Sequence, residues 1–208
     1  MVKVSAPMLS MDASGTIGKA AVFSKWKGRN YVRSHVVPHN PKSAGQIGVR
    51  AMFKFLAQEW NGLGTTPKGT WSEIATALNI SGFNAYIRAN QRRWRNFRAP
   101  SMDETAAEGH TSAVLNAWSA TVGIRQIDLL VSLTTANANW GAMIFRNLVT
   151  GFTPTWSDCI AVISVTGTGS HHFIDTPLVA DTYYYKHRLF TDDGKLSTAS
   201  AEVNGVVA

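Results

Sequence analysis

The hydrophobic pattern of this 208-residue chain changes its period near Ala99-Pro100, and this change most constrains the fold. Before that point, apolar residues recur at intervals of three and four, as on one face of an α-helix. After it they alternate, as on one face of a half-buried β-strand. The change predicts an α+β protein, in which a β-hairpin plus three-helix module over residues 16–98 is followed by an all-β sandwich.

The net charge changes at the same place. Residues 1–98 carry fifteen Lys or Arg and three Asp or Glu, a net charge of +12, whereas residues 99–208 carry five and ten, a net charge of −5. So basic a half favours anionic surfaces, whether nucleic acid, lipid headgroups or an acidic protein patch. Alternatively, the basic half docks on the acidic half of its own chain.

The first residues predict an arm and a hairpin. Residues 1–15 are small and polar, and we expect an extended arm that is either disordered or ordered by a neighbouring subunit. Two strand-like runs follow, over Thr16–Ser24 and Asn30–Val37, and Gly28 between them can supply the positive φ of a hairpin loop.

Apolar spacing and capping residues predict three helices. The first spans about Ser43–Asn61. The second spans Thr70–Asn79 and opens with Thr70 and Glu73 at the spacing of a capping box. The third runs over about residues 83–97, with an apolar stripe on its inner face.

Arginines of the third helix form a basic ridge. Arg88, Arg92 and Arg95 are spaced by four and three residues, so they lie on one helix face. No Asp or Glu lies between Glu73 and Asp103, and unrelieved like charge costs stability. The ridge therefore predicts contact with an anionic surface; the other interpretation is a solvated face. The candidate contact residues are Arg88, Arg92, Arg95, Arg98, Arg50 and Lys54.

Part of the N-terminal half resembles a known protein pattern. The residues that carry it are Gly15-Thr16-Ile17-Gly18, Trp26-Lys27-Gly28-Arg29-Asn30-Tyr31-Val32-Arg33, Asn40-Pro41, Gln46 with Arg50, Trp60, Trp71 and Ser81-Gly82-Phe83-Asn84-Ala85-Tyr86. Over about residues 14–97, this resembles an N-terminal pattern in virion-associated proteins of tailed bacteriophages and prophages. The resemblance implies a context, a virion, rather than an activity.

The C-terminal part predicts a linker and a sandwich. Residues 99–111 are rich in small and acidic residues and are typical of a linker. Residues 112–208 hold seven strand-like runs separated by turn residues, which favours a β-sandwich. The runs are Ala113–Val122, Arg125–Thr134, Trp140–Leu148, Cys159–Val165, His171–Ile174, Thr182–Thr191 and Ser197–Val207.

The end of the chain resembles the last two strands of fibronectin type III domains, over Pro177–Leu189 with Asp193–Ser197. In that family a Leu, here Leu178, precedes a Tyr whose hydroxyl bonds back to the backbone at a strand corner. Tyr184 keeps the family's offset from the Leu, whereas Tyr183 lies on the apolar face of its strand, and the pattern favours Tyr183. The resemblance implies an immunoglobulin-like sandwich that acts as a spacer or binding module, without catalysis.

Enzyme motifs are mostly absent from the sequence. It has no Gly-rich phosphate loop, no nucleophile elbow and no His-Glu-x-x-His. Cys159 lies in an apolar run and is expected to be a buried, inert thiol. Adjacent His171 and His172 point to opposite faces of a strand and cannot hold one metal together. A sugar hydrolase needs two carboxylates in one cleft, and the N-terminal half has only three acidic residues.

These observations predict a non-enzymatic bacteriophage virion structural protein, in capsid decoration, head-to-tail connection or the tail. Its basic N-terminal module would anchor it to the virion, and its sandwich would project from the virion or bind a partner. We expect a homo-oligomer that contacts other virion proteins, assembles in the host cytoplasm, and uses no membrane, cofactor or metal. The alternative is a sequence-tolerant nucleic-acid-binding accessory protein that uses the arginine ridge.

Overall fold

A computed structural model describes residues 15–18, 20–26, 28–37, 40, 42–107, 109, 115–133 and 139–208. The chain divides into two units, Met1–Pro41 and Lys42–Ala208. Nearly all of the predicted arm, residues 1–14, lies outside the described residues.

The first unit contains a three-stranded antiparallel sheet in the order β1-β2-β3. Its strands are β1 (Gly15–Ile17), β2 (Ala21–Trp26) and β3 (Arg29–Ser34). The predicted hairpin at Gly28 is confirmed, with φ +80° at that glycine. The prediction of one strand over Thr16–Ser24 is wrong, because Gly18, at φ +54°, turns the chain between β1 and β2.

The second unit begins with α1 (Ala44–Gly62), α2 (Thr65–Leu78) and α3 (Gly82–Arg95). The Ser81 side chain caps α3 by accepting a hydrogen bond from the backbone N–H of Asn84 at 3.2 Å. The start predicted for α2 is wrong. Pro67 fits the first turn of a helix, and Thr70 Oγ1 donates to the Pro67 carbonyl instead of capping.

Seven strands follow, and they form two antiparallel sheets with orders β10-β9-β6-β7 and β4-β5-β8. Each falls within or close to a predicted run. They are β4 (Leu115–Gly123), β5 (Gln126–Leu133), β6 (Asn139–Asn147), β7 (Cys159–Ser164), β8 (Gly169–Asp175), β9 (Asp181–Thr191) and β10 (Val203–Val207), with the 3-10 turn η1 (Trp156–Asp158) before β7.

The last predicted run, Ser197–Val207, is longer than the strand that the structure contains there. Only its second half is β10, although the first half also bonds to β9, both through serine side chains and through the backbone, where the Ser197 N–H donates to the Leu189 carbonyl at 2.8 Å. The backbone N–H of Leu189 donates to Ser197 Oγ at 2.8 Å, and that of His187 donates to Ser200 Oγ at 2.9 Å.

A tyrosine fixes the corner that leads into β9. Tyr183 OH donates to the Val179 carbonyl at 3.1 Å, so Tyr183 rather than Tyr184 makes the predicted bond. Tyr184 packs instead against the cluster that contains the helices. The neighbouring Tyr185 OH donates to Asp175 at 2.9 Å, and Arg146 pairs with the same carboxylate at 2.8 Å.

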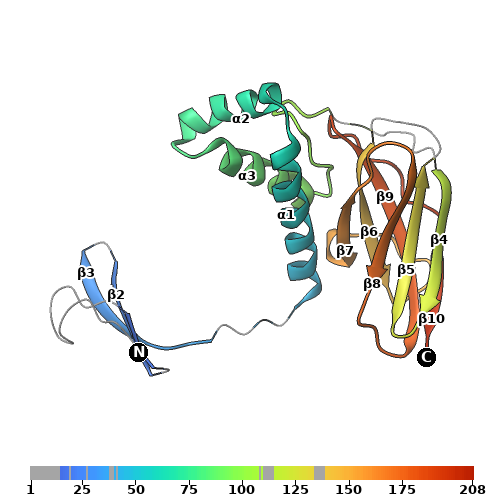
Figure 1. The fold of residues 1–208 in the computed structure, drawn as a ribbon, viewed down its shortest axis with the longest axis horizontal. Coiled ribbons are helices and arrows are strands. Elements are labelled where there is room, and N and C mark those ends of the chain that lie inside the picture. The colour runs from blue at the N-terminus through green and yellow to red at the C-terminus, as the bar shows by residue number, and fades with distance from the viewer. Residues whose placement is uncertain are drawn as a thin grey trace. The chain divides into compact units, whose positions relative to one another are not determined.

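The helices and the two sheets form three layers, with the four-stranded sheet in the middle (Figure 1). Ile144, Tyr185 and Leu189 of that sheet pack with residues of β5 on the opposing sheet. On its other face, Trp140, Met143 and Phe145 of β6 and Phe190 of β9 pack with the helices. The fold is therefore mixed α+β, and its middle sheet is buried on both faces.

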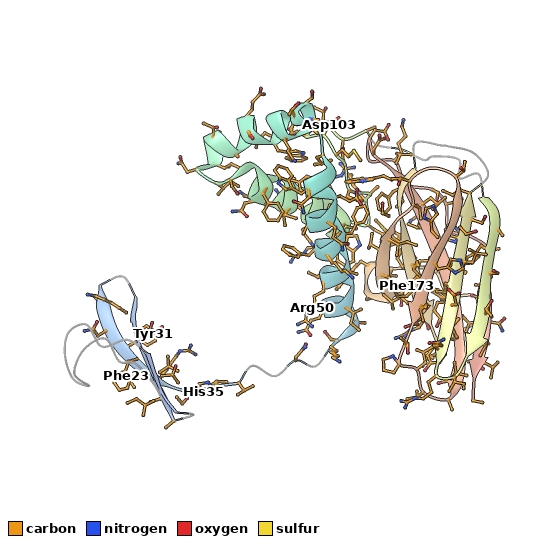
Figure 2. The ribbon with its side chains drawn as sticks, viewed as in Figure 1. Phe23, Tyr31, His35, Arg50, Asp103 and Phe173 are labelled. Carbon is orange, nitrogen blue, oxygen red and sulfur yellow. The ribbon has the colours of Figure 1, made fainter. Side chains whose placement is uncertain are left out.

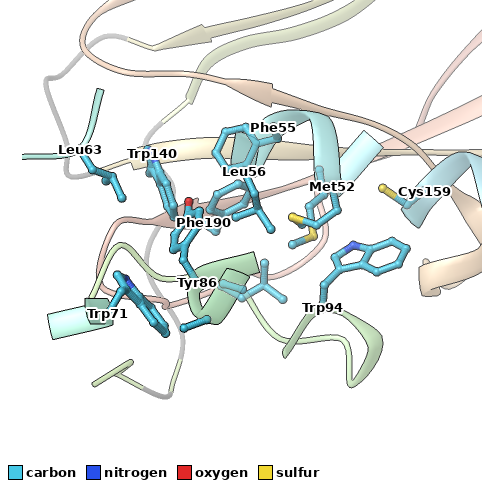
Figure 3. Packing of buried hydrophobic residues seen from close by; sticks show 14 of the residues in the cluster. Met52, Phe55, Leu56, Leu63, Trp71, Tyr86, Trp94, Trp140, Cys159 and Phe190 are labelled. Atoms are coloured by element: carbon cyan, nitrogen blue, oxygen red, sulfur yellow. The ribbon is translucent and has the colours of Figure 1, made fainter. Parts of the chain in front are cut away.

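An aromatic cluster joins the helices to the middle sheet (Figure 3). The Phe55 ring of α1 lies 5.1 Å from Trp140 and 5.4 Å from Phe190, centroid to centroid, with edge-to-face geometry in both cases. Trp140 Nε1 also donates to the Glu59 carboxylate of α1 at 2.8 Å. This burial joins residues 42–98 and 112–208 through one core, whereas the sequence predicted separate modules.

The predicted linker, residues 99–111, also packs closely where it is described. Ser101 is buried and exchanges two hydrogen bonds with the Asn90 side chain, at 2.8 and 3.0 Å. The Met102 N–H donates to the Asp192 carbonyl at 2.8 Å, and the Met102 carbonyl accepts from Trp71 Nε1. This segment therefore ties α2 and α3 to the end of β9.

The shared core predicts one cooperative unfolding transition for residues 42–208. Replacing Phe55, 2% exposed, by Ala should lower the free energy of unfolding by about 3 kcal/mol. Helix and strand signals should fall together in a thermal melt followed by circular dichroism. Phe53→Ala on the same helix, where the ring is 47% exposed, is the matched control and should cost less than about 1 kcal/mol. Separate helix and strand transitions would contradict the shared core.

His187 predicts a pH dependence of stability. It lies buried on β9, its ring centroid 4.5 Å from that of Trp118, and burial lowers its pKa to about 4. In the unfolded chain a histidine takes up its proton below about pH 6.5. Stability should therefore be complete above that pH and fall by about 3 kcal/mol as the pH drops to about 4.

Urea titrations across this pH range measure the effect. His187→Phe keeps the aromatic contact and should remove most of the slope. Leu148→Phe places a ring at a position that is 56% exposed and changes no titratable group, so this control should keep the slope. An unchanged slope in His187→Phe would assign the dependence to other groups.

Candidate anionic contact site

The packing of α3 decides where its arginines lie. Tyr86 and Trp94 are at most 1% exposed and face the core, so the helix is fixed about its axis. Arg88, Arg92 and Arg95 consequently lie on the opposite face, and all three side chains are exposed. The predicted ridge is therefore present as a surface of α3. Basic residues in the last turn also interact favourably with the partial negative charge of the helix C-terminus.

The predicted contact residues line two different pockets. Arg88, Arg92 and Arg98 line a pocket of about 440 Å³ between α2 and α3, here called the α2–α3 groove. Arg95 and Arg50 line a second pocket of about 590 Å³ beside η1. The sequence predicted one basic surface, and the structure brings together one group of three and one pair.

The second pocket combines cations with an exposed aromatic ring. Trp156 of η1 is 44% exposed and lines it together with Arg95 of α3 and Arg50, which projects from the first half of α1 (Figure 2). The helix approaches this ring closely, since a Cβ at Gly45 would lie 2.8 Å from Trp156. Lys54, the sixth predicted contact residue, is exposed farther along α1.

Arg93 has a structural role that spacing alone did not indicate. Its Nε donates to the Ala99 carbonyl at 2.7 Å, and its Nη2 donates to the Gly194 carbonyl at 3.3 Å. The side chain therefore connects α3 to the segment after it and to the turn that follows β9. The hollow at Gly194 accommodates this guanidinium, since a Cβ there would lie 2.9 Å from Nη2.

The apolar wall of the α2–α3 groove was also missed. Trp71, Ile74 and Leu78 recur at intervals of three and four along α2 and line the groove. Leu78 is 44% exposed, although the spacing would place it in a core. The signal in the sequence was one apolar stripe on α2, in which Trp71 and Ala75 are buried and Leu78 is left at the exposed edge.

Two other predictions about chemistry can be compared with the structure. Cys159 is buried, and burial raises the pKa of its thiol to about 12, which agrees with the predicted inert thiol. His172 bonds to Asp128 at 3.0 Å on the outer face of its sheet, while His171 pairs with Val131, whose side chain is buried. Among the described residues, no three His, Cys, Asp or Glu side chains lie together as potential metal ligands. No helix in these same ranges is long and apolar enough to cross a membrane.

Comparisons with known proteins give little information. No family model and no curated protein matches the chain. Among solved structures, the crystal structure of beta-1,2-glucanase from Parabacteroides distasonis has 18% sequence identity and a TM-score of 0.34. The similarity covers 47% of this chain and 14% of that chain. A TM-score this low indicates neither a shared fold nor a shared activity.

Structural and surface arginines of α3 should respond differently to mutation. Arg93→Ala removes charge-assisted hydrogen bonds to buried carbonyls and should lower the free energy of unfolding by about 2 kcal/mol. Arg92→Ala, at the exposed neighbouring position, should change it by less than about 0.5 kcal/mol. Urea denaturation measures both, and equal losses would contradict the assignment.

Proposed function

We propose that this chain is a non-enzymatic structural protein of a tailed-bacteriophage virion. The observation that carries the proposal is the basic surface of α3, where Arg88, Arg92 and Arg95 are all exposed on a helix whose other face is buried. The resemblance of residues 14–97 to virion-associated proteins supplies the context. The surface would contact an acidic neighbour in the particle, in a homo-oligomer that serves as capsid decoration, head-to-tail connection or tail component.

We further propose that residues 112–208 are a fibronectin type III-like sandwich that projects or binds. Seven strands in two antiparallel sheets are the architecture of immunoglobulin-like domains. Tyr183 lies near the start of the sixth strand of this region, and its hydroxyl donates to the Val179 carbonyl. Immunoglobulin-like domains have their tyrosine corner at the same place. The outer face at Trp140 departs from a free-standing sandwich, because it carries α1.

A second candidate is a sequence-tolerant nucleic-acid-binding accessory protein. One observation favours it, namely the exposed ring of Trp156 beside Arg50 and Arg95. Aromatic rings that stack on bases, combined with cations that meet phosphates, are the usual means of binding single strands. Such binding would weaken steeply as the salt concentration rises.

Charge reversal of the ridge tests the virion role. Changing Arg88, Arg92 and Arg95 to Glu takes the net charge of residues 1–98 from +12 to +6, since each reversal changes it by two. The exposed positions should leave the fold intact, as measured by circular dichroism. Incorporation into purified particles, measured by mass spectrometry, should fail because the surface then repels its acidic neighbour.

The matched control changes the same three residues to Lys and should still be incorporated. A reversed variant that enters particles as well as the parent chain would make the ridge a solvated face. Absence of the parent chain from particles, together with salt-sensitive binding of single-stranded DNA, would support the second candidate instead.

A further inference from the structure

We infer that the α2–α3 groove is a docking site for an acidic amphipathic helix of another protein. The inference rests on the proposed function, since it names the kind of neighbour that the basic surface would contact. The groove combines two features that this occupant needs and that few other ligands need together, an apolar wall and a guanidinium rim.

The apolar wall is built by small and large residues on facing helices. The three-residue connection between α2 and α3 makes the two helices neighbours. Ala85 and Ala89 of α3 leave a hollow because their side chains are single methyl groups, and Ile74 and Leu78 of α2 border it. Leu78 is 44% exposed in this position, so an apolar side chain placed here would remove apolar surface from water.

The rim of the groove carries two arginines that are not paired with other groups of the described chain. Arg88 and Arg92 lie one helical turn apart along α3, and both are exposed. Within the described part of the chain, neither makes a hydrogen bond or an ion pair. Arg93, in contrast, is bound to backbone carbonyls. Glu104 also lines the groove, but no ion pair joins its carboxylate to Arg88 or Arg92 in the described part of the chain, so these two cations border the apolar wall on its α3 side.

The size and the charge of the groove together favour a helix. From Ala85 to Asn96 it extends about 16 Å along α3, which is about three helical turns. A helix with leucines on one face would fill the wall, and carboxylates one turn apart on its flank would meet Arg88 and Arg92. A nucleic acid would satisfy the arginines but would leave Ile74 and Leu78 against sugar and phosphate, which is why the apolar wall favours a protein partner.

Fluorescence anisotropy with a designed peptide tests this inference on the full chain. The probe is a labelled helical peptide with leucines on one face and glutamates on the flank, and a scrambled peptide of the same composition is its control. Arg88→Ala with Arg92→Ala should weaken binding of the probe about tenfold. Leu78→Ser should weaken it by a similar factor, because it removes the apolar contact.

Matched variants separate the groove from general charge. Arg95→Ala removes an exposed arginine of the same helix that lines the other pocket, and Leu148→Ser removes a leucine that is 56% exposed outside the groove. Each should change binding less than about twofold. Reversal of Arg88 and Arg92 to Glu should transfer the preference to a peptide with lysines in place of the glutamates.

Several results would overturn the inference. These are no binding of the leucine–glutamate peptide, equal binding of the scrambled peptide, an equal loss in Arg95→Ala, or displacement of the peptide by duplex DNA. None of these results depends on particles, so failure of this test and failure of the virion role can be told apart.

Discussion

The contact of Phe55 with Trp140 and Phe190 determines how the second unit is built. It places α1 on the outer face of the middle sheet, and the hydrogen bond from Trp140 Nε1 to Glu59 fixes the helix at the same point. Aromatic side chains bury large apolar areas, and edge-to-face pairs add a preference for one orientation. Without this contact, apolar side chains on both surfaces would face water. The helices and the sheets consequently share one core instead of forming two domains.

The position of the arginine surface follows from that core. Tyr86 of α3 packs against Trp60 of α1 and Trp71 of α2, and Trp94 of α3 packs against Trp156 of η1. Because these two side chains are buried, the residues on the opposite face of α3 are exposed. The residues that directly follow α3 are held by the paired hydrogen bonds of Asn90 with Ser101 and by the bond from Arg93 to Ala99. The helices that carry the basic surface and the α2–α3 groove are therefore packed into the core, which suits a docking surface because their backbone is already folded before a partner binds.

Local patterns in the sequence predicted the elements, and long-range packing decided what they could not predict. Helical spacing located α1 and α3, and strand-like runs between turn residues located all seven strands of the sheets, because each signal lies within one element. The shared core depends on β6, where Trp140, Met143 and Phe145 pack against helices far away in sequence. The nearly continuous apolar run of β6 was the available signal, since a strand buried on both faces loses its alternation.

The candidate site illustrates the same limit for charge. Counting showed that residues 1–98 are strongly basic, but it could not separate arginines that hold the fold from those that are available to a partner. Position relative to the core separates them. Arg93 donates hydrogen bonds to backbone carbonyls outside its helix, whereas Arg88 and Arg92, on the same helix, border the apolar wall of the α2–α3 groove. A cation beside exposed apolar surface can bind more selectively than a cation on a polar face, because its partner must match charge and shape together.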